Sequence, residues 1–248
     1  MTGDKKLSIL GHIAELRGRL VKSVIAVAIT TILSFVFANQ IFQVLLLPVP
    51  GIKLIYIDMT EMIGMYMKVC LSAGIALAMP YLIYHAVMFV APALTPKERR
   101  YVLLVLPWIA AMFVGGMLFS YFVLLPPAVR FLTTFGSDIA TPQIRIGSYI
   151  SVVTRLILAT GVIFELPVIS TFLARLGVIT SSWLAGKRKV AIVGAFILGA
   201  LITPTFDPIN QSLVAGPLIV LFEMSIWLAK LVQPKHAKQA ATLPTTVG

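Results

Sequence analysis

Long apolar runs separated by short polar segments dominate the chain. A bilayer core of about 30 Å needs roughly 20 consecutive apolar residues in one helix. Six runs reach or approach that length and predict transmembrane helices: about 21–38, 65–89, 102–126, 150–174, 189–203 and 212–230. The fifth rises only about 22 Å. Either the bilayer thins beside this helix or it forms a tight hairpin with the sixth. We therefore expect an all-α protein with short helices five and six.

The basic residues orient these helices. The segment before the first run, the loops after the second and fourth runs, and the tail hold 15 of the 20 Lys and Arg residues. Cytoplasmic segments carry the excess of positive charge, so both termini are expected in the cytoplasm. Prolines fall within or at the ends of several runs and should bend the helices. We expect a concave, curved bundle.

The pattern divides the chain into three segments. In residues 1–20, Leu10, Ile13, Leu16 and Leu20 recur at helical spacing, which predicts an amphipathic helix lying in the cytoplasmic interface. Residues 21–232 form the six-span membrane domain. Residues 233–248 have few apolar positions and predict a disordered cytoplasmic tail.

Composition supports a membrane protein and excludes several other classes. The 248 residues are 59% hydrophobic and 12% charged, whereas soluble domains carry about 25% charged residues. The net charge of +11 comes without a basic stripe interleaved with aromatics, so nucleic acid is not an expected partner. Cys70 is the only cysteine, which rules out a disulfide within the chain.

No motif for catalysis or metal binding is present. The sequence has no H-E-x-x-H, G-x-S-x-G or Walker A pattern. The histidines, at 12, 85 and 236, lie on separate segments without ligand spacing. His85 lies beside Tyr81 and Tyr84 and is expected to be a hydrogen-bonded packing residue. We therefore expect no enzyme activity, no metal and no cofactor.

Carboxylates provide the remaining chemistry, and two lie in cytoplasmic segments. Glu15 and Arg19 have the i,i+4 spacing of a helical ion pair. Glu98 follows Thr95 and Pro96 at the position where it closes a capping box at a helix N-terminus. Each pattern is thus explained either by local structure or by a binding role.

Two further acids lie within predicted spans. Glu165 lies ten residues from both Arg155 and Arg175, near the middle of its helix. A charged side chain there costs about 2.5–3.5 kcal/mol on insertion scales, so it usually has a function. Pro167 leaves a nearby carbonyl without its helical donor, which predicts a polar pocket. Glu223 lies nearer the cytoplasmic side, where helix packing is the favoured interpretation.

Several stretches, in this order, resemble a known family over about residues 10–231. These stretches are HIAELRGRL, FVAPALTPKERR, TGVIFELPV, KVAIVGAFILGALITP and QSLVAGPLIVLFE. Each is short, but their combination is specific. The chain resembles the twin-arginine translocase subunit TatC family.

The resemblance implies a receptor core in the cell inner membrane that binds signal peptides with two consecutive arginines. TatA-like and TatB-like single-span subunits would join it in a multimeric complex that moves folded proteins outward using the proton motive force. The implied signal-peptide-binding residues are Glu15, Glu98, Arg17 and Arg99. Glu165 matches the family's intramembrane acid.

The resemblance also places partner-helix docking at the hairpin between helices five and six, with Thr203 and Gln211 as candidates. The turn TPTFDPINQ is one residue longer than the family's turn, which leaves the role of Asp207 open. From the residues alone, a second function is possible, a proton-coupled small-solute transporter with Glu165 as its carrier site. The sequence has neither an internal repeat nor a second ionisable group at mid-span that would support it.

Overall fold

Helices make up nearly all of the described chain. The computed structural model describes residues 9–48, 54–90, 96–135, 138, 139, 141, 143–203 and 208–232. Across these residues, the pairing outside helices is a single β-bridge, between Ile55 and Arg145. The all-α prediction is confirmed.

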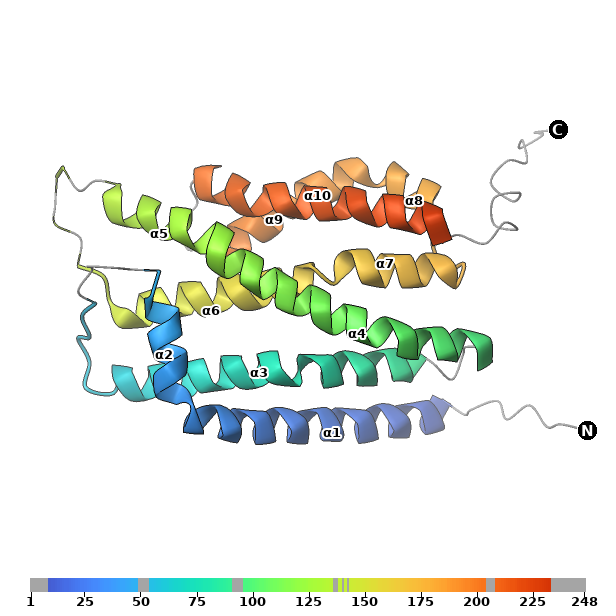
Figure 1. The fold of residues 1–248 in the computed structure, drawn as a ribbon, viewed down its shortest axis with the longest axis horizontal. Helices are drawn as coiled ribbons and strands as arrows, with labels where there is room; N and C mark the ends of the chain where they lie inside the picture. The colour runs from blue at the N-terminus through green and yellow to red at the C-terminus, as the bar shows by residue number, and fades with distance from the viewer. Residues whose placement is uncertain are drawn as a thin grey trace, which may run out of the picture. The chain divides into compact units, whose positions relative to one another are not determined.

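The helices follow one another with mostly short connections (Figure 1). Their bounds are α1 Ile9–Val36, α2 Ala38–Leu46, α3 Glu61–Val90, α4 Pro96–Phe119, the π-helix η2 Ser120–Leu124, α5 Leu125–Thr134, α6 Ile146–Ile163, α7 Leu166–Arg175, α8 Ser181–Gly186, α9 Arg188–Ile202 and α10 Pro208–Val232.

Five segments of the described chain are long and apolar enough to cross a membrane: Ile13–Val36, Glu61–Phe89, Val105–Thr134, Ile146–Arg175 and Pro208–Val232. They correspond to five of the six predicted runs. The other run is α9, whose 15 residues rise about 22 Å. Its predicted shortness is confirmed.

The sixth helix is longer than predicted. We expected helices five and six both to be short, but α10 has 25 residues. It begins at Pro208, since proline suits the first helical position, where no N–H is needed. It then continues through Pro217 to Val232. Of the two predicted spans, only the fifth, α9, is therefore short.

The beginning of the described chain is helical, as predicted. The amphipathic segment expected over 11–20 is helical, but it is the first part of α1, which runs unbroken from Ile9 to Val36. No proline interrupts residues 9–36, so nothing in the sequence forces a change of direction at residue 20. The segment is thus continuous with the first span.

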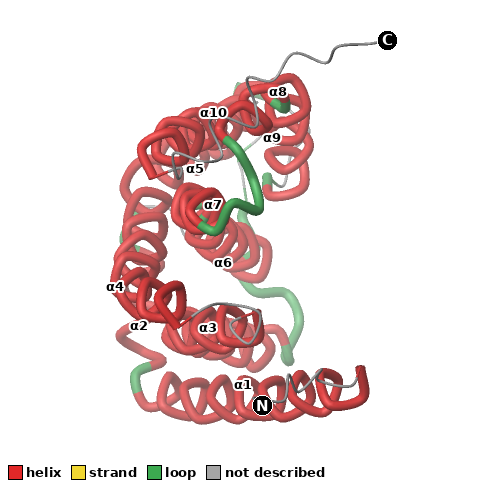
Figure 2. Tube along the Cα trace, turned by 90° about the vertical axis from the view of Figure 1, so that its right-hand side faces the viewer, coloured by secondary structure: helices red, strands yellow, loops and turns green. Residues whose placement is uncertain are grey.

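The chain divides into two compact units, the first formed by residues 1–44 and 58–110. Its main packing is between α1 and α3, which lie side by side (Figures 1 and 2). The hydroxyl of Thr30 donates to the carbonyl of Gly74 at 2.8 Å. A Cβ at Gly74 would lie 2.7 Å from the Cα of Thr31, so only glycine allows the two helices to approach this closely.

The second unit comprises residues 45–57 and 111–248. Here α10 packs against α7, α8 and α9, as Figure 2 shows for the group α8, α9 and α10. Part of the core is apolar contact among Ala174, Leu184, Ile226 and Ala229. The second half of α4 meets α6 at Gly116, where an added Cβ would lie 2.9 Å from the Cα of Gly161.

A loop before α3 is held to the start of α6 in the same unit. Ile55 receives a hydrogen bond from the amide of Ile146 at 2.8 Å and donates to the carbonyl of Ile144 at 3.0 Å. The buried hydroxyl of Tyr149 donates to the carbonyl of Leu45 at 2.7 Å. These bonds fix the first turn of α6, the helix that leads to Glu165.

Candidate functional site

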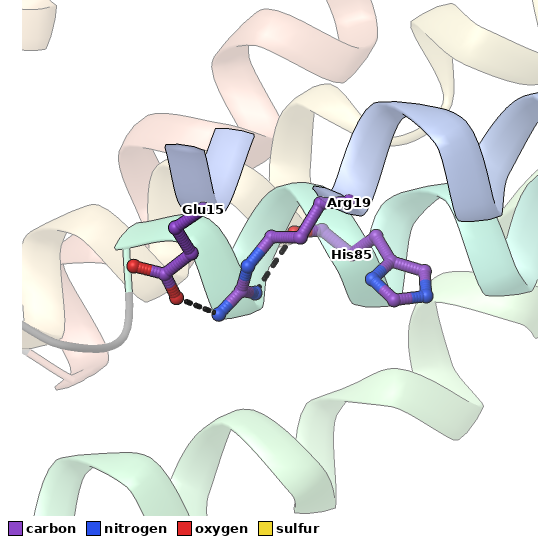
Figure 3. Close-up of polar contacts among 3 residues, drawn as sticks. All are labelled: Glu15, Arg19 and His85. Carbon is purple, nitrogen blue, oxygen red and sulfur yellow. Dashed lines mark hydrogen bonds and ion pairs between the residues drawn. The ribbon is translucent and has the colours of Figure 1, made fainter. Parts of the chain in front are cut away.

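Glu15 and Arg19 form an ion pair one helical turn apart on α1. The Arg19 guanidinium donates from Nη2 to Oε1 of Glu15, and from Nη1 to the backbone carbonyl of His85 on α3 at 3.3 Å (Figure 3). The Glu15 side chain is 29% exposed and the Arg19 side chain is 19% exposed. The Arg19 guanidinium therefore links a carboxylate on α1 to a backbone carbonyl on α3.

His85 packs differently from the prediction. Its ring contacts Tyr81 edge-on, with the centroids 4.4 Å apart, and Tyr84 at 5.5 Å. Both ring nitrogens are buried and have no hydrogen-bond partner in the described part of the chain. The packing role is confirmed, but the expected hydrogen bond is absent there. The backbone carbonyl, rather than the ring, makes the polar contact to α1.

The other predicted signal-binding residues are only partly described. Arg17 is exposed, and its position two residues before Arg19 places it on a different face of α1. Glu98 and Arg99 lie in the first turn of α4, which begins at Pro96 as the proline predicted. Their side chains lie outside the described part of the structure, so their role in binding the signal peptide stays a prediction.

Glu165 is buried where the fourth span is broken. The helix α6 ends at Ile163 and α7 begins at Leu166, with Glu165 at the N-cap position. The break follows from Pro167, which has no N–H to continue the helical hydrogen bonds. The Glu165 side chain is 2% exposed. The predicted distortion of the helix around this acid is confirmed.

The Glu165 carboxyl group is unsatisfied. Neither of its oxygens has a hydrogen-bond partner among the described residues, and the same is true of the buried hydroxyls of Ser120 and Thr160. Buried polar atoms usually have partners, and each exception requires an explanation such as bound water or a ligand. The second unit thus contains three buried polar side chains that require such an explanation.

Glu223 links two helices at the surface. Its carboxylate accepts from Nε of Arg188 at 2.7 Å and from Nη2 at 2.9 Å. The pair joins the first residue of α9 to α10. This bidentate contact supports the packing role expected for Glu223.

The two docking candidates make contacts within the α9–α10 hairpin. The Thr203 hydroxyl donates to the Gly199 carbonyl at 2.8 Å. The Gln211 side chain donates to the Phe196 carbonyl at 2.7 Å. The Thr203 bond therefore closes the end of α9, the Gln211 bond joins α10 to α9, and the role of both residues in partner docking stays a prediction. Asp207 lies outside the described residues.

Two features of the candidate sites could not be predicted from the sequence. The His85 carbonyl is a backbone atom, and nothing in a side-chain pattern indicates its contact with Arg19. Ser120 and Thr160 are ordinary residues of apolar runs, and only their burial without a hydrogen-bond partner among the described residues distinguishes them. Within the described chain, no group of three His, Cys, Asp or Glu side chains could hold a metal.

Comparison with known proteins identifies the fold and the family. Residues 11–217 match the model of the family "Sec-independent protein translocase protein (TatC)". The chain belongs to the TatC family. The TatC protein of Carboxydothermus hydrogenoformans is 39% identical over 235 residues, which cover 94% of this chain and 97% of that protein. The TatC protein of Aquifex aeolicus is 39% identical over 230 residues, which cover 90% and 95%.

A solved structure agrees with this assignment. A crystal structure described as the twin arginine translocase receptor TatC superposes with a TM-score of 0.80 at 39% identity, covering 89% of this chain and 99% of that one. The match supports the six-span fold. This TatC family member is therefore a multi-pass membrane protein and a protein-translocase component, not an enzyme. The solute-transporter alternative has no support from these matches.

Proposed function

We propose that this TatC family member is the receptor that binds twin-arginine signal peptides at the cytoplasmic face of the inner membrane. In this proposal it organises TatA-like and TatB-like single-span subunits in a multimeric complex, and folded proteins cross the membrane using the proton motive force. The observation that carries the proposal is the Glu15 carboxylate, which holds a guanidinium group in the free chain.

The charge pattern explains why binding must be local. Most Lys and Arg residues lie in the segments assigned to the cytoplasmic side, so a basic peptide is repelled at long range. A pair of arginines then needs carboxylates placed at contact distance. Arginine binds carboxylates with a planar fork of donors, whereas lysine is a point charge. Glu15 and Glu98 are the proposed acceptors, with Arg17 and Arg99 beside them.

Glu165 has a different proposed role. Its buried carboxyl group lies at the break in the fourth span, without a hydrogen-bond partner in the described chain. A polar group in that position provides a contact for the signal peptide, or for a partner helix, once it has entered the membrane. We propose that Glu165 acts during transport of the cargo and not in the initial recognition of the two arginines.

Partner docking is proposed at the α9–α10 hairpin. Because α9 has 15 residues, it is shorter than the roughly 20 that span the bilayer core. Thr203 and Gln211 lie at this hairpin. A single-span subunit beside it would meet a thinned bilayer and a polar edge, which favours helix association.

A binding experiment tests the receptor role. The full chain is placed in lipid nanodiscs, and the affinity for a fluorescent peptide with two consecutive arginines is measured. Glu15→Gln combined with Glu98→Gln is expected to weaken binding by about tenfold or more, as for loss of charge-assisted hydrogen bonds. Glu223→Gln removes another carboxylate paired with an arginine and serves as the control. Undiminished binding in the double variant would overturn the proposal.

A further inference from the structure

Arg19 occupies the position that a ligand arginine would need. Its guanidinium lies between the Glu15 carboxylate of α1 and the His85 carbonyl of α3 and donates to both (Figure 3). The two acceptors come from helices that are packed along their lengths. Their separation is therefore set by the α1–α3 packing rather than by Arg19 itself.

We infer that the Glu15 carboxylate and the His85 carbonyl form a guanidinium-binding site, which Arg19 fills in the free chain and which one arginine of the signal peptide takes over by displacing Arg19. This inference rests on the proposed receptor function. It adds His85, through its backbone, to the binding residues, and it makes recognition an exchange of one arginine for another.

The acceptor pair suits a guanidinium specifically. Charge-assisted bonds from a planar fork to two oxygens combine energy with geometry. An ammonium group concentrates its donors on one nitrogen, so it reaches two separately held acceptors less well. Occupation by Arg19 shows that both oxygens are within reach of a single guanidinium.

Arg19 is also held weakly enough to leave. The pair with Glu15 has i,i+4 spacing and is partly exposed, and such pairs contribute little to stability. The arginine side chain is long and flexible and can turn toward the headgroups when displaced. The carboxylate, in contrast, stays on its helix. Displacement therefore leaves the acceptor pair in place.

Exchange has a measurable consequence. If Arg19 competes with the ligand, removing its guanidinium strengthens binding, although the residue lies in the binding site. If Arg19 had only a structural role, replacing it would instead weaken binding of the peptide. The same replacement should have no effect once the Glu15 carboxylate is absent, because Arg19 then no longer occupies a charged acceptor.

The test measures affinity for the two-arginine peptide with the full chain in nanodiscs. Arg19→Met is expected to bind about three- to fivefold more tightly, the range for releasing a partly exposed ion pair. Lys22→Met removes a positive charge one turn along the same helix and controls for net charge. In the Glu15→Gln background, Arg19→Met should leave the affinity unchanged.

The possible outcomes separate the two proposals. Unchanged or weaker binding by Arg19→Met, with Glu15→Gln still reducing affinity, overturns the exchange and leaves the receptor role intact. An equal gain from Lys22→Met also overturns it, since the effect would be one of charge alone. Normal binding by Glu15→Gln alone also overturns the exchange, whereas normal binding by the Glu15→Gln and Glu98→Gln double variant overturns the receptor assignment itself. Arg19→Gln carries the same expectation and replaces Arg19→Met if that variant does not fold.

Discussion

Gly116 on α4 and Phe164 at the end of α6 touch without space for another atom. A Cβ at Gly116 would lie 2.8 Å from the Cβ of Phe164, the residue directly before Glu165. The aromatic ring of Phe164 also lies against Phe119, with centroids 5.4 Å apart. The position of the buried acid therefore depends on a close helix crossing.

Gly116→Ala should destabilise the protein. The added methyl group forces Phe164 or the helix backbone to move, and such overpacking costs about 1–3 kcal/mol. The neighbouring Gly115→Ala is the matched control, because nothing lies within 4 Å of its Cβ and alanine favours the helix by about 1 kcal/mol. In thermal unfolding in detergent, Gly116→Ala should have a lower midpoint temperature than the unchanged protein, and Gly115→Ala should not. Equal midpoints would contradict the close crossing.

Tyr149→Phe should destabilise the second unit. The substitution removes the hydrogen bond to the Leu45 carbonyl and leaves a buried acceptor without a partner, at about 1–3 kcal/mol. Tyr56 is 64% exposed, so Tyr56→Phe should change stability by less than about 0.5 kcal/mol. The unfolding midpoints of the two variants measure the difference. A Tyr149→Phe variant as stable as Tyr56→Phe would show that this contact contributes nothing.

Glu165→Gln should retain the fold and binding of the signal peptide but impair transport. Glutamine preserves the size of the side chain while removing its ability to carry charge at the break in the fourth span. Export of a folded reporter protein with a twin-arginine signal, measured in cells, checks this expectation. Glu223→Gln, which alters an exposed acid of α10, should export normally. Normal export by Glu165→Gln would exclude a role for its carboxylate in transport.

The main features of the fold could be predicted because bilayer thickness sets the length of an apolar run. The short fifth helix and the break near Pro167 follow from local rules of this kind. The helix α2 was missed, since nine residues are too few to stand out beside the longer first run. The π-helix at Ser120–Leu124 has no proline or glycine to mark it.

The candidate site could be predicted only in part. Acids in a membrane protein are few, so Glu15 and Glu165 were readily identified as candidates. The i,i+4 spacing also predicted the Arg19 contact, which the structure confirms. The His85 carbonyl could not be predicted, because its position depends on how α3 packs against α1. The topology, with both termini in the cytoplasm, and the concave shape stay predictions.

Binding of two matched peptides tests the central claim most directly. One signal peptide carries two consecutive arginines, and the other carries lysines at the same positions, so charge is equal. Recognition by carboxylate and carbonyl acceptors predicts that the full chain in nanodiscs binds the arginine peptide about tenfold more tightly. Equal affinity for the two peptides would contradict the account, since attraction between opposite charges alone would then explain binding.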